Sequence, residues 1–252
     1  MTHAPVAGPT VALVHGAFAD SSGWTGVIHR LRAAGVSAQA VSNPLRGIAE
    51  DAAYVASALA QIPGPVLAVG HSYGGAIITN AAVRAGNVVG LVYVAAFAPA
   101  EGEKLLEVEN GSTDSVLNTA LVERQYPAGD GTAGEFSIDP AKFHSVFAAD
   151  LSEEDAADMA ATQRPVSALG FVEPNGAPAW AELPSWAVVA TGDTAAGADV
   201  VRSMAQRAGA TITEAEGSHV IFISRPDVVA DAILEAHGTL ARQAADGAAA
   251  AV

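Results

Sequence analysis

Ser72 lies at the centre of Gly70-His71-Ser72-Tyr73-Gly74-Gly75, which contains the pattern G-x-S-x-G. An apolar run from Pro65 to Val69 precedes it, and a stretch of helical length from Ala76 to Ala85 follows. This context predicts a sharp strand-to-helix turn that lifts a serine hydroxyl above the edge of a sheet, where it acts as a nucleophile. An ordinary glycine-rich loop between a strand and a helix is the alternative. Ser72 is therefore the first candidate for covalent chemistry.

A serine hydroxyl needs a base to remove its proton and a carboxylate to orient that base. His219 follows the last predicted strand, and Asp193 directly follows the predicted strand Trp186 to Ala190. Both places lie at the carboxyl edge of a parallel sheet, where they can meet Ser72. The chain order Ser72, Asp193, His219 is also the one expected of this architecture. A surface-loop histidine and a capping aspartate are the alternatives. Other carboxylates that could serve are Asp199, Glu214, Glu216, Glu101 and Glu103.

Acyl transfer also needs hydrogen-bond donors for the negative charge that develops on the carbonyl oxygen. The predicted donors are the backbone N–H of Tyr73 and that of Ala17 in the loop after the first strand, with Phe18 as the alternative to Ala17. The side chains of Phe18, Trp24 and Tyr73 are candidates to bind substrate, and plain core packing is the competing interpretation. His15, which closes the first strand, is expected to be a structural histidine bonded to backbone.

Short apolar runs alternate with helical segments along most of the chain. The predicted strands are Thr10–His15, Ser37–Val41, Val66–Val69, Val88–Ala95, Trp186–Ala190 and Ala210–Glu214. The predicted helices are Ser22–Ala34, Ile48–Gln61, Ala76–Ala85, Asp199–Ala208 and Pro226–His237. This alternation predicts the α/β class, with a mostly parallel central sheet of about six strands and helices on both faces.

The alternation breaks between about Phe97 and Pro184, where glycine, proline and acidic residues separate helical pieces such as 140–150 and 152–163. We interpret this stretch as an inserted cap. The predicted organisation is 1–98 for the N-terminal part of the core, 99–184 for the cap, and 185–238 for the C-terminal part of the core. Residues 239–252 are expected to form a flexible alanine-rich tail.

The composition limits the classes of function. Half of the 252 residues are apolar, which suits one domain with a buried core, and there is no cysteine to form a thiolate nucleophile or a disulfide. A formal charge of −15 predicts that neither nucleic acid nor an anionic membrane is a partner. Residues 1–10 lack signal-peptide features and no apolar run reaches membrane-spanning length, so the expected location is the cytoplasm.

These motifs together resemble the α/β-hydrolase superfamily. The likeness rests on His15-Gly16-Ala17-Phe18, the motif around Ser72, Thr191-Gly192-Asp193 and Gly217-Ser218-His219, and it extends over roughly Thr10 to His237. The chain particularly resembles small bacterial hydrolases related to plant methylesterases and hydroxynitrile lyases. The resemblance implies ester hydrolysis without a cofactor. The lyases have a threonine and a lysine where this chain has Gly16 and Val220, which favours an esterase over a lyase.

The sequence thus predicts a serine hydrolase that cleaves small to medium uncharged, apolar esters through an acyl-enzyme, with no metal or organic cofactor. The expected partner is a small-molecule ester, and the chain is expected to be a monomer or a homodimer. Much of the pocket would come from the cap, whose candidate side chains are Phe136, Phe143, Phe147, Met159, Phe171 and Trp180. Packing within the cap is the favoured interpretation for most of them. The same three residues could instead cleave lactones, amides or carbon–carbon bonds, or catalyse perhydrolysis or a lyase reaction. A non-catalytic ligand-binding protein on this scaffold is the less favoured alternative.

Overall fold

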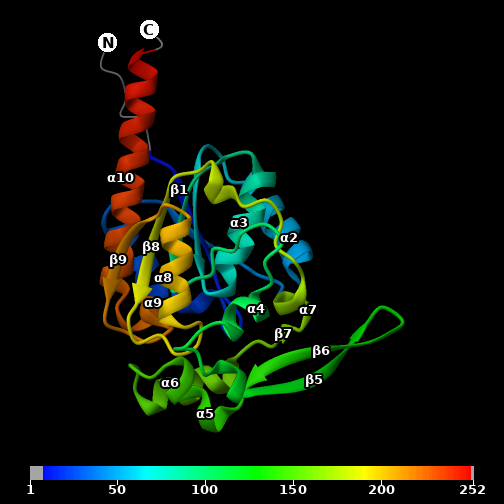
Figure 1. Ribbon diagram of the computed structural model, residues 1–252. Helices are drawn as coiled ribbons and strands as arrows, with labels where there is room; N and C mark the ends of the chain where they lie inside the picture. Colours follow the sequence, from blue (N-terminus) through cyan, green and yellow to red (C-terminus); the bar gives the residue numbers. More distant parts are fainter. Residues whose placement is uncertain (1–7, 251–252) are drawn as a thin grey trace.

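A computed structural model describes residues 8–250 of the chain and has a six-stranded sheet at its centre (Figure 1). The strand order is β2-β1-β3-β4-β8-β9, and all neighbouring strands are parallel. The strands are β1 (Thr10–Val14), β2 (Ala38–Val41), β3 (Val66–His71), β4 (Val88–Val94), β8 (Ser185–Ala190) and β9 (Thr211–Ala215). The predicted α/β fold and its parallel sheet are confirmed.

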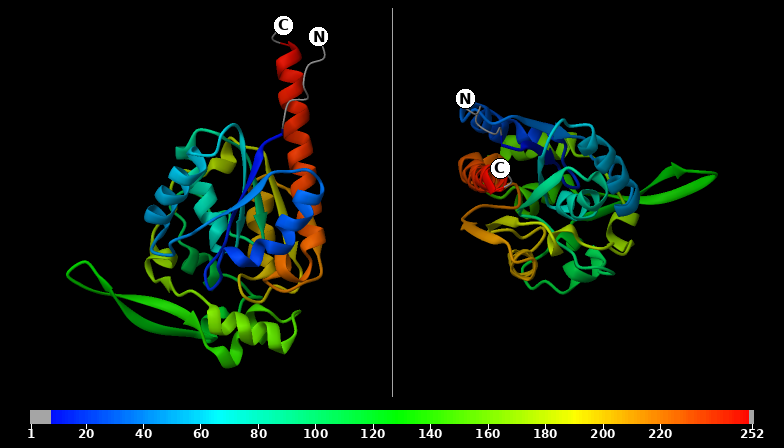
Figure 2. Two further views of the ribbon diagram at one scale, coloured as in Figure 1. Left: turned by 180° about the vertical axis from the view of Figure 1, so that it is seen from behind. Right: turned by 90° about the horizontal axis from the view of Figure 1, so that it is seen from above.

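Helices cover the sheet on both faces (Figure 2). On one side α1 (Thr25–Ala33) packs against α10 (Pro226–Ala250), which also contacts β4 and β8; on the other, α2 (Ile48–Ala60) packs against α3 (Tyr73–Ala85). The remaining core helices are α8 (Ala198–Arg207) and the short α9 (Ile221–Ser224) and η1 (Ser21–Trp24). Every residue of β3 is buried, because helices exclude water from both of its faces, and this accounts for the apolar run from Val66 to Val69.

The cap lies over the carboxyl ends of the strands (Figure 1). It contains a three-stranded antiparallel sheet of β5 (Leu121–Ala128), β6 (Gly131–Ile138) and β7 (Val166–Ser167). Its helices are α4 (Leu105–Asn110), η2 (Leu117–Thr119), α5 (Pro140–Phe147), α6 (Glu153–Thr162) and α7 (Leu169–Val172). The inserted segment ends with η3 (Ala179–Ala181), which contacts α3 and leads into the amino end of β8. The two predicted helical pieces of this segment correspond to α5 and α6.

The β5–β6 hairpin, which projects from the body as an arm, was not predicted (Figures 1 and 2). A local signal for it exists in the two-residue turn Gly129-Asp130, where Gly129 has a φ of 56°. A glycine with positive φ followed by aspartate is typical of tight hairpin turns. Both faces of β5 and β6 are partly exposed, so apolar and polar residues do not alternate clearly along them. Their sequences therefore did not predict strands.

The closing helix α10 is longer than the sequence suggested. It was predicted to end at His237 and to be followed by a flexible tail over 239–252, but it continues through Ala250; residues 251 and 252 of that segment lie outside the described residues. Alanine has the highest intrinsic helix propensity, and Leu240 anchors this stretch by packing on the core, so the helix continues past the body. Among the described helices, none is both long and apolar enough to cross a membrane.

The approach of α3 to β1 allows no side chain at Gly74. A Cβ at this position would lie 2.6 Å from the Val14 carbonyl oxygen and 2.8 Å from that of His15. Gly74→Ala is therefore expected to lower the free energy of unfolding by about 1–3 kcal/mol through overpacking, as measured by urea denaturation. Gly247→Ala, in an open part of α10, is the control and should leave stability unchanged or slightly higher. Equal stabilities of wild type and Gly74→Ala would contradict this close approach.

Candidate active site

Ser72 connects β3 to α3 in a strained backbone conformation, with φ 53° and ψ −125°. Positive φ is rare for a residue with a Cβ and persists only where the surrounding structure imposes it. The loop after β1 approaches closely, since a Cβ at Gly16 would lie 2.7 Å from the Ser72 Cβ. This is the geometry of the predicted turn, and it directs the serine side chain toward the carboxyl edge of the sheet.

A continuous chain of hydrogen bonds joins Ser72, His219 and Asp193. The Ser72 Oγ lies 2.8 Å from His219 Nε2, and His219 Nδ1 lies 2.8 Å from Asp193 Oδ2. The three residues are 6 %, 2 % and 1 % exposed. Because a carboxylate accepts hydrogen bonds, Nδ1 carries the imidazole proton, which leaves Nε2 as an acceptor for the serine hydroxyl. The structure thus brings together the three residues that the sequence singled out.

The second oxygen of Asp193 is also engaged. Its Oδ1 accepts hydrogen bonds from the backbone N–H groups of Ala195 and Ala196, at 2.9 and 3.0 Å. These donors come from the turn directly after β8, so the carboxylate is oriented by its own loop. Burial of a carboxylate is favourable only when such donors satisfy it.

His71 binds the backbone of His219 from the core side, a role that was not predicted from the sequence. The His71 Nε2 donates to the backbone oxygen of His219 at 2.9 Å, and the two ring centroids are 4.7 Å apart. Complete burial, together with the neighbouring His219, lowers the pKa of His71 well below its ordinary value. His71 is therefore neutral. Its place directly before Ser72 was the only signal in the sequence.

The loop after β1 is held by His15, as predicted for a structural histidine. Its Nδ1–H donates to the Gly16 carbonyl at 2.9 Å, and its Nε2 accepts from the Asn43 backbone N–H at 3.1 Å. Burial lowers the pKa of His15 to about 4, so it is uncharged near neutral pH. The amides of Ala17 and Tyr73 lie on the two segments that flank Ser72, and their service as oxyanion donors stays a prediction.

An aromatic cluster covers His219 from the cap side. Phe147, at the end of α5, lies 4.9 Å from the His219 ring, 6.0 Å from Phe18 and 5.1 Å from Phe143, measured between ring centroids. Phe18 has a φ of 59°, a second strained residue next to the site. The surroundings of the hydrogen-bond chain are thus apolar. Contact of Phe18 with a substrate remains a prediction.

Two of the aromatic side chains proposed to bind substrate have packing partners. Trp24 is fully buried and lies between Phe222 and His71, at centroid distances of 4.6 and 6.5 Å. The Tyr73 hydroxyl donates to Asp51 at 2.8 Å. The Tyr73 ring also lies beside Gly170 of α7. Both side chains are thus engaged in packing, and contact of either with a substrate stays a prediction.

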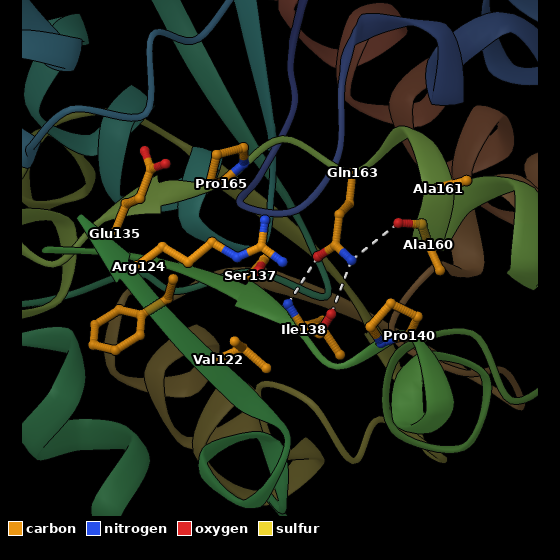
Figure 3. Close-up of a pocket in the computed structure, with 11 residues that line it drawn as sticks. Val122, Arg124, Glu135, Ser137, Ile138, Pro140, Ala160, Ala161, Gln163 and Pro165 are labelled. Atoms are coloured by element: carbon orange, nitrogen blue, oxygen red, sulfur yellow. Dashed lines mark hydrogen bonds between the residues drawn. The ribbon is translucent and has the colours of Figure 1, made fainter. Parts of the chain in front are cut away.

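A cavity of about 220 Å³ lies apart from the serine, between the β5–β6 hairpin and α6 (Figure 3). Its lining includes Val122, Arg124, Ser137 and Pro140, and the Gln163 amide bonds both backbone groups of Ile138 there. A second cavity of about 400 Å³ is lined by Leu106, Leu121, Phe136 and Phe171. Neither is lined by Ser72, His219 or Asp193, so neither is the candidate active site.

A parallel sheet covered by helices, with a Ser–His–Asp hydrogen-bond chain at its carboxyl edge, is typical of α/β-hydrolases. The chain belongs to the Alpha/beta hydrolase family, whose sequence pattern it matches over residues 11–232. This assignment supports hydrolase activity. A comparison with curated protein sequences gives no significant match.

Solved structures show the same fold at low sequence identity. Polyneuridine aldehyde esterase is 19 % identical with a TM-score of 0.76, covering 90 % of this chain and 98 % of that one. A pyrethroid hydrolase from Sphingobium faniae JZ-2 is 23 % identical with a TM-score of 0.72, covering 90 % and 96 %. Tomato methylketone synthase I, complexed with 2-tridecanone, is 18 % identical with a TM-score of 0.74, covering 92 % and 99 %. These similarities establish the architecture.

The Asp51–Tyr73 pair allows a test of the structural role of the Tyr73 side chain. Burial raises the pKa of Asp51, while hydrogen bonds from the Arg46 backbone and from Tyr73 oppose that rise. Tyr73→Phe removes one donor from this buried carboxyl and should lower the free energy of unfolding by about 1–3 kcal/mol in urea denaturation. Tyr54→Phe, at a side chain that is 52 % exposed, is the control and should have no effect. Unchanged stability of Tyr73→Phe would refute the packing role.

Glu109 in α4 is a buried carboxyl close to Asp193. Burial raises the pKa of Glu109 to about 7, and the nearby negative charge of Asp193 adds to the rise. The folded state therefore binds a proton more tightly than the unfolded chain, whose glutamate pKa is about 4.3. Stability from this group is present at low pH and is lost as the pH rises through about 7.

Glu109→Gln should remove that loss. As the pH rises from 5 to 8, wild type should lose on the order of 1–3 kcal/mol of its free energy of unfolding through Glu109, and the variant should not. Urea denaturation at several pH values measures this difference, and Glu107→Gln, an exposed position of the same helix, is the control. Parallel curves for wild type and Glu109→Gln would mean that Glu109 does not titrate in this range.

Proposed function

We propose that the protein is a serine hydrolase that cleaves small to medium uncharged, apolar carboxylic esters through an acyl-enzyme intermediate. The hydrogen-bond chain from Ser72 through His219 to Asp193 is the observation that carries this proposal. Membership in the Alpha/beta hydrolase family supports it, as do similar structures that are called an esterase and a hydrolase.

In the first half-reaction, His219 Nε2 takes the proton of Ser72 while Oγ forms a bond to the ester carbonyl carbon. The carbonyl oxygen becomes an oxyanion, for which the N–H groups of Ala17 and Tyr73 are the proposed donors. Asp193 holds the Nδ1 proton and stabilises the imidazolium. When the tetrahedral intermediate collapses, the bond to the alcohol oxygen breaks and His219 gives that oxygen its proton.

In the second half-reaction, water replaces the alcohol. His219 removes a proton from the water as its oxygen attacks the acyl carbon, and the proton then returns to Ser72 as the carboxylic acid leaves. The aromatic surroundings of Phe18 and Phe147 suit apolar groups and exclude water from the developing charges. A highly anionic substrate is disfavoured by the formal charge of −15.

Hydrolysis of p-nitrophenyl acetate, butyrate and octanoate by wild type and Ser72→Ala tests the proposal. The variant should lose about 10⁴-fold or more in kcat/KM, because the nucleophile and its base act as a unit. Ser203→Ala, at an exposed serine of α8, is the control and should equal wild type. Wild type should also be labelled by a fluorophosphonate at Ser72.

Equal turnover by wild type and Ser72→Ala would show that Ser72 is not the nucleophile. Labelling of wild type without turnover of any ester would keep Ser72 as a nucleophile and overturn the ester substrate. Neither labelling nor turnover would overturn the proposed function as a whole.

A further inference from the structure

The end of cap helix α5 contacts the loops of both His219 and Asp193. The Thr194 hydroxyl, one residue past Asp193, donates to the Val146 carbonyl at 3.2 Å. The Phe147 ring lies against the His219 imidazole at 4.9 Å. The cap is therefore in contact with the residues that orient the imidazole, and its role extends beyond covering them.

The strongest of these contacts is made by Asp150, in the connection between α5 and α6. Its Oδ2 accepts from the Ser218 backbone N–H at 2.9 Å, and its Oδ1 accepts from the Ser218 hydroxyl at 2.5 Å. The Ser224 hydroxyl donates to Oδ2 at 2.6 Å. Both carboxylate oxygens thus bind the segment that carries His219, although the residue as a whole is exposed.

The protonation state of Asp150 fits this role. Partial burial favours the neutral acid, but the combined hydrogen bonds from Ser218 and Ser224 outweigh it and lower the pKa of Asp150. The group is therefore an anion near neutral pH, and hydrogen bonds to an ionised acceptor are stronger and more directional than neutral ones.

We propose that Asp150 is a positioning residue for His219 and couples the seating of the cap to the alignment of the Ser72–His219–Asp193 chain. This inference rests on the proposed function. Ser218 precedes His219 directly, so a carboxylate that holds both its N–H and its hydroxyl fixes the backbone from which the imidazole extends. His71 holds the carbonyl of His219 from the core side.

The consequence for the reaction is that alignment of the imidazole depends on the contact between the cap and the loop of His219. Loss of the Asp150–Ser218 contact removes the restraint on that loop from the cap side. A base misplaced by about 1 Å costs on the order of 10²-fold in rate, so such coupling is large enough to measure.

Steady-state kinetics with p-nitrophenyl butyrate is the first test. In Asp150→Asn an amide NH2 replaces one carboxylate oxygen, so that a donor faces the donors of Ser218 and Ser224. The variant should lower kcat by about 10- to 100-fold, with KM changed less than about threefold. The matched control is Ser224→Ala, which removes a hydrogen bond to the same carboxylate but lies beyond His219, and it should stay within about twofold of wild type. Circular dichroism and thermal melts establish that each variant is folded.

A second readout does not need turnover. Proton NMR at low field detects the His219 Nδ1 proton shared with Asp193, and its assignment follows from its loss in His219→Gln. Asp150→Asn should shift or broaden this resonance, and Ser224→Ala should not. A residue with a purely structural role would change the melting temperature and leave this resonance and kcat in place.

Wild-type kcat together with an unchanged resonance in Asp150→Asn would overturn the inference, as would equal losses in Asp150→Asn and Ser224→Ala. If Asp150→Asn does not fold, Ser218→Ala takes its place, and a wild-type kcat and spectrum in that variant would overturn the inference. A resonance displaced in Asp150→Asn, in a protein that turns over no ester, would support the positioning role while the proposed ester hydrolysis fails.

Discussion

The strained backbone of Ser72 is the constraint on which the rest of the site depends. A residue with a Cβ at a φ of 53° costs on the order of 1–3 kcal/mol, so the surroundings must impose that conformation. They do so through the buried strand β3 on one side and the buried first turns of α3 on the other. The loop after β1 then approaches so closely that no side chain fits at positions 16 and 74, where the chain has glycine.

The hydrogen-bond partners of the three buried histidines, rather than their burial, distinguish the proposed base from the other two. His15 and His71 are as buried as His219, but each bonds to backbone groups, and burial lowers the pKa of both. They remain neutral supports. His219 alone of these three has a carboxylate on one nitrogen and a hydroxyl on the other, an arrangement that stabilises the imidazolium formed when the serine gives up its proton.

The cap has two distinct parts with different relations to the site. Its hairpin arm and α6 enclose a cavity that lies away from the serine, whereas α5 and the connection after it touch the loops of His219 and Asp193. The apolar face of α5 excludes water near His219, while the carboxylate of Asp150, in the connection after α5, binds the same loop. Shielding and alignment thus come from one short segment of the inserted region.

The sequence by itself determined the parallel sheet, the order of its helices, and the choice of Ser72, Asp193 and His219, because these follow from local apolar runs and from residues placed at strand ends. The tertiary structure alone decided the roles of His71, Phe147 and Asp150 and the packing partners of Trp24 and Tyr73. Local patterns specify where a strand ends and a loop begins. They do not specify which side chain of a distant segment meets that loop, because such contacts arise only when the cap and the core pack together and water is excluded between them.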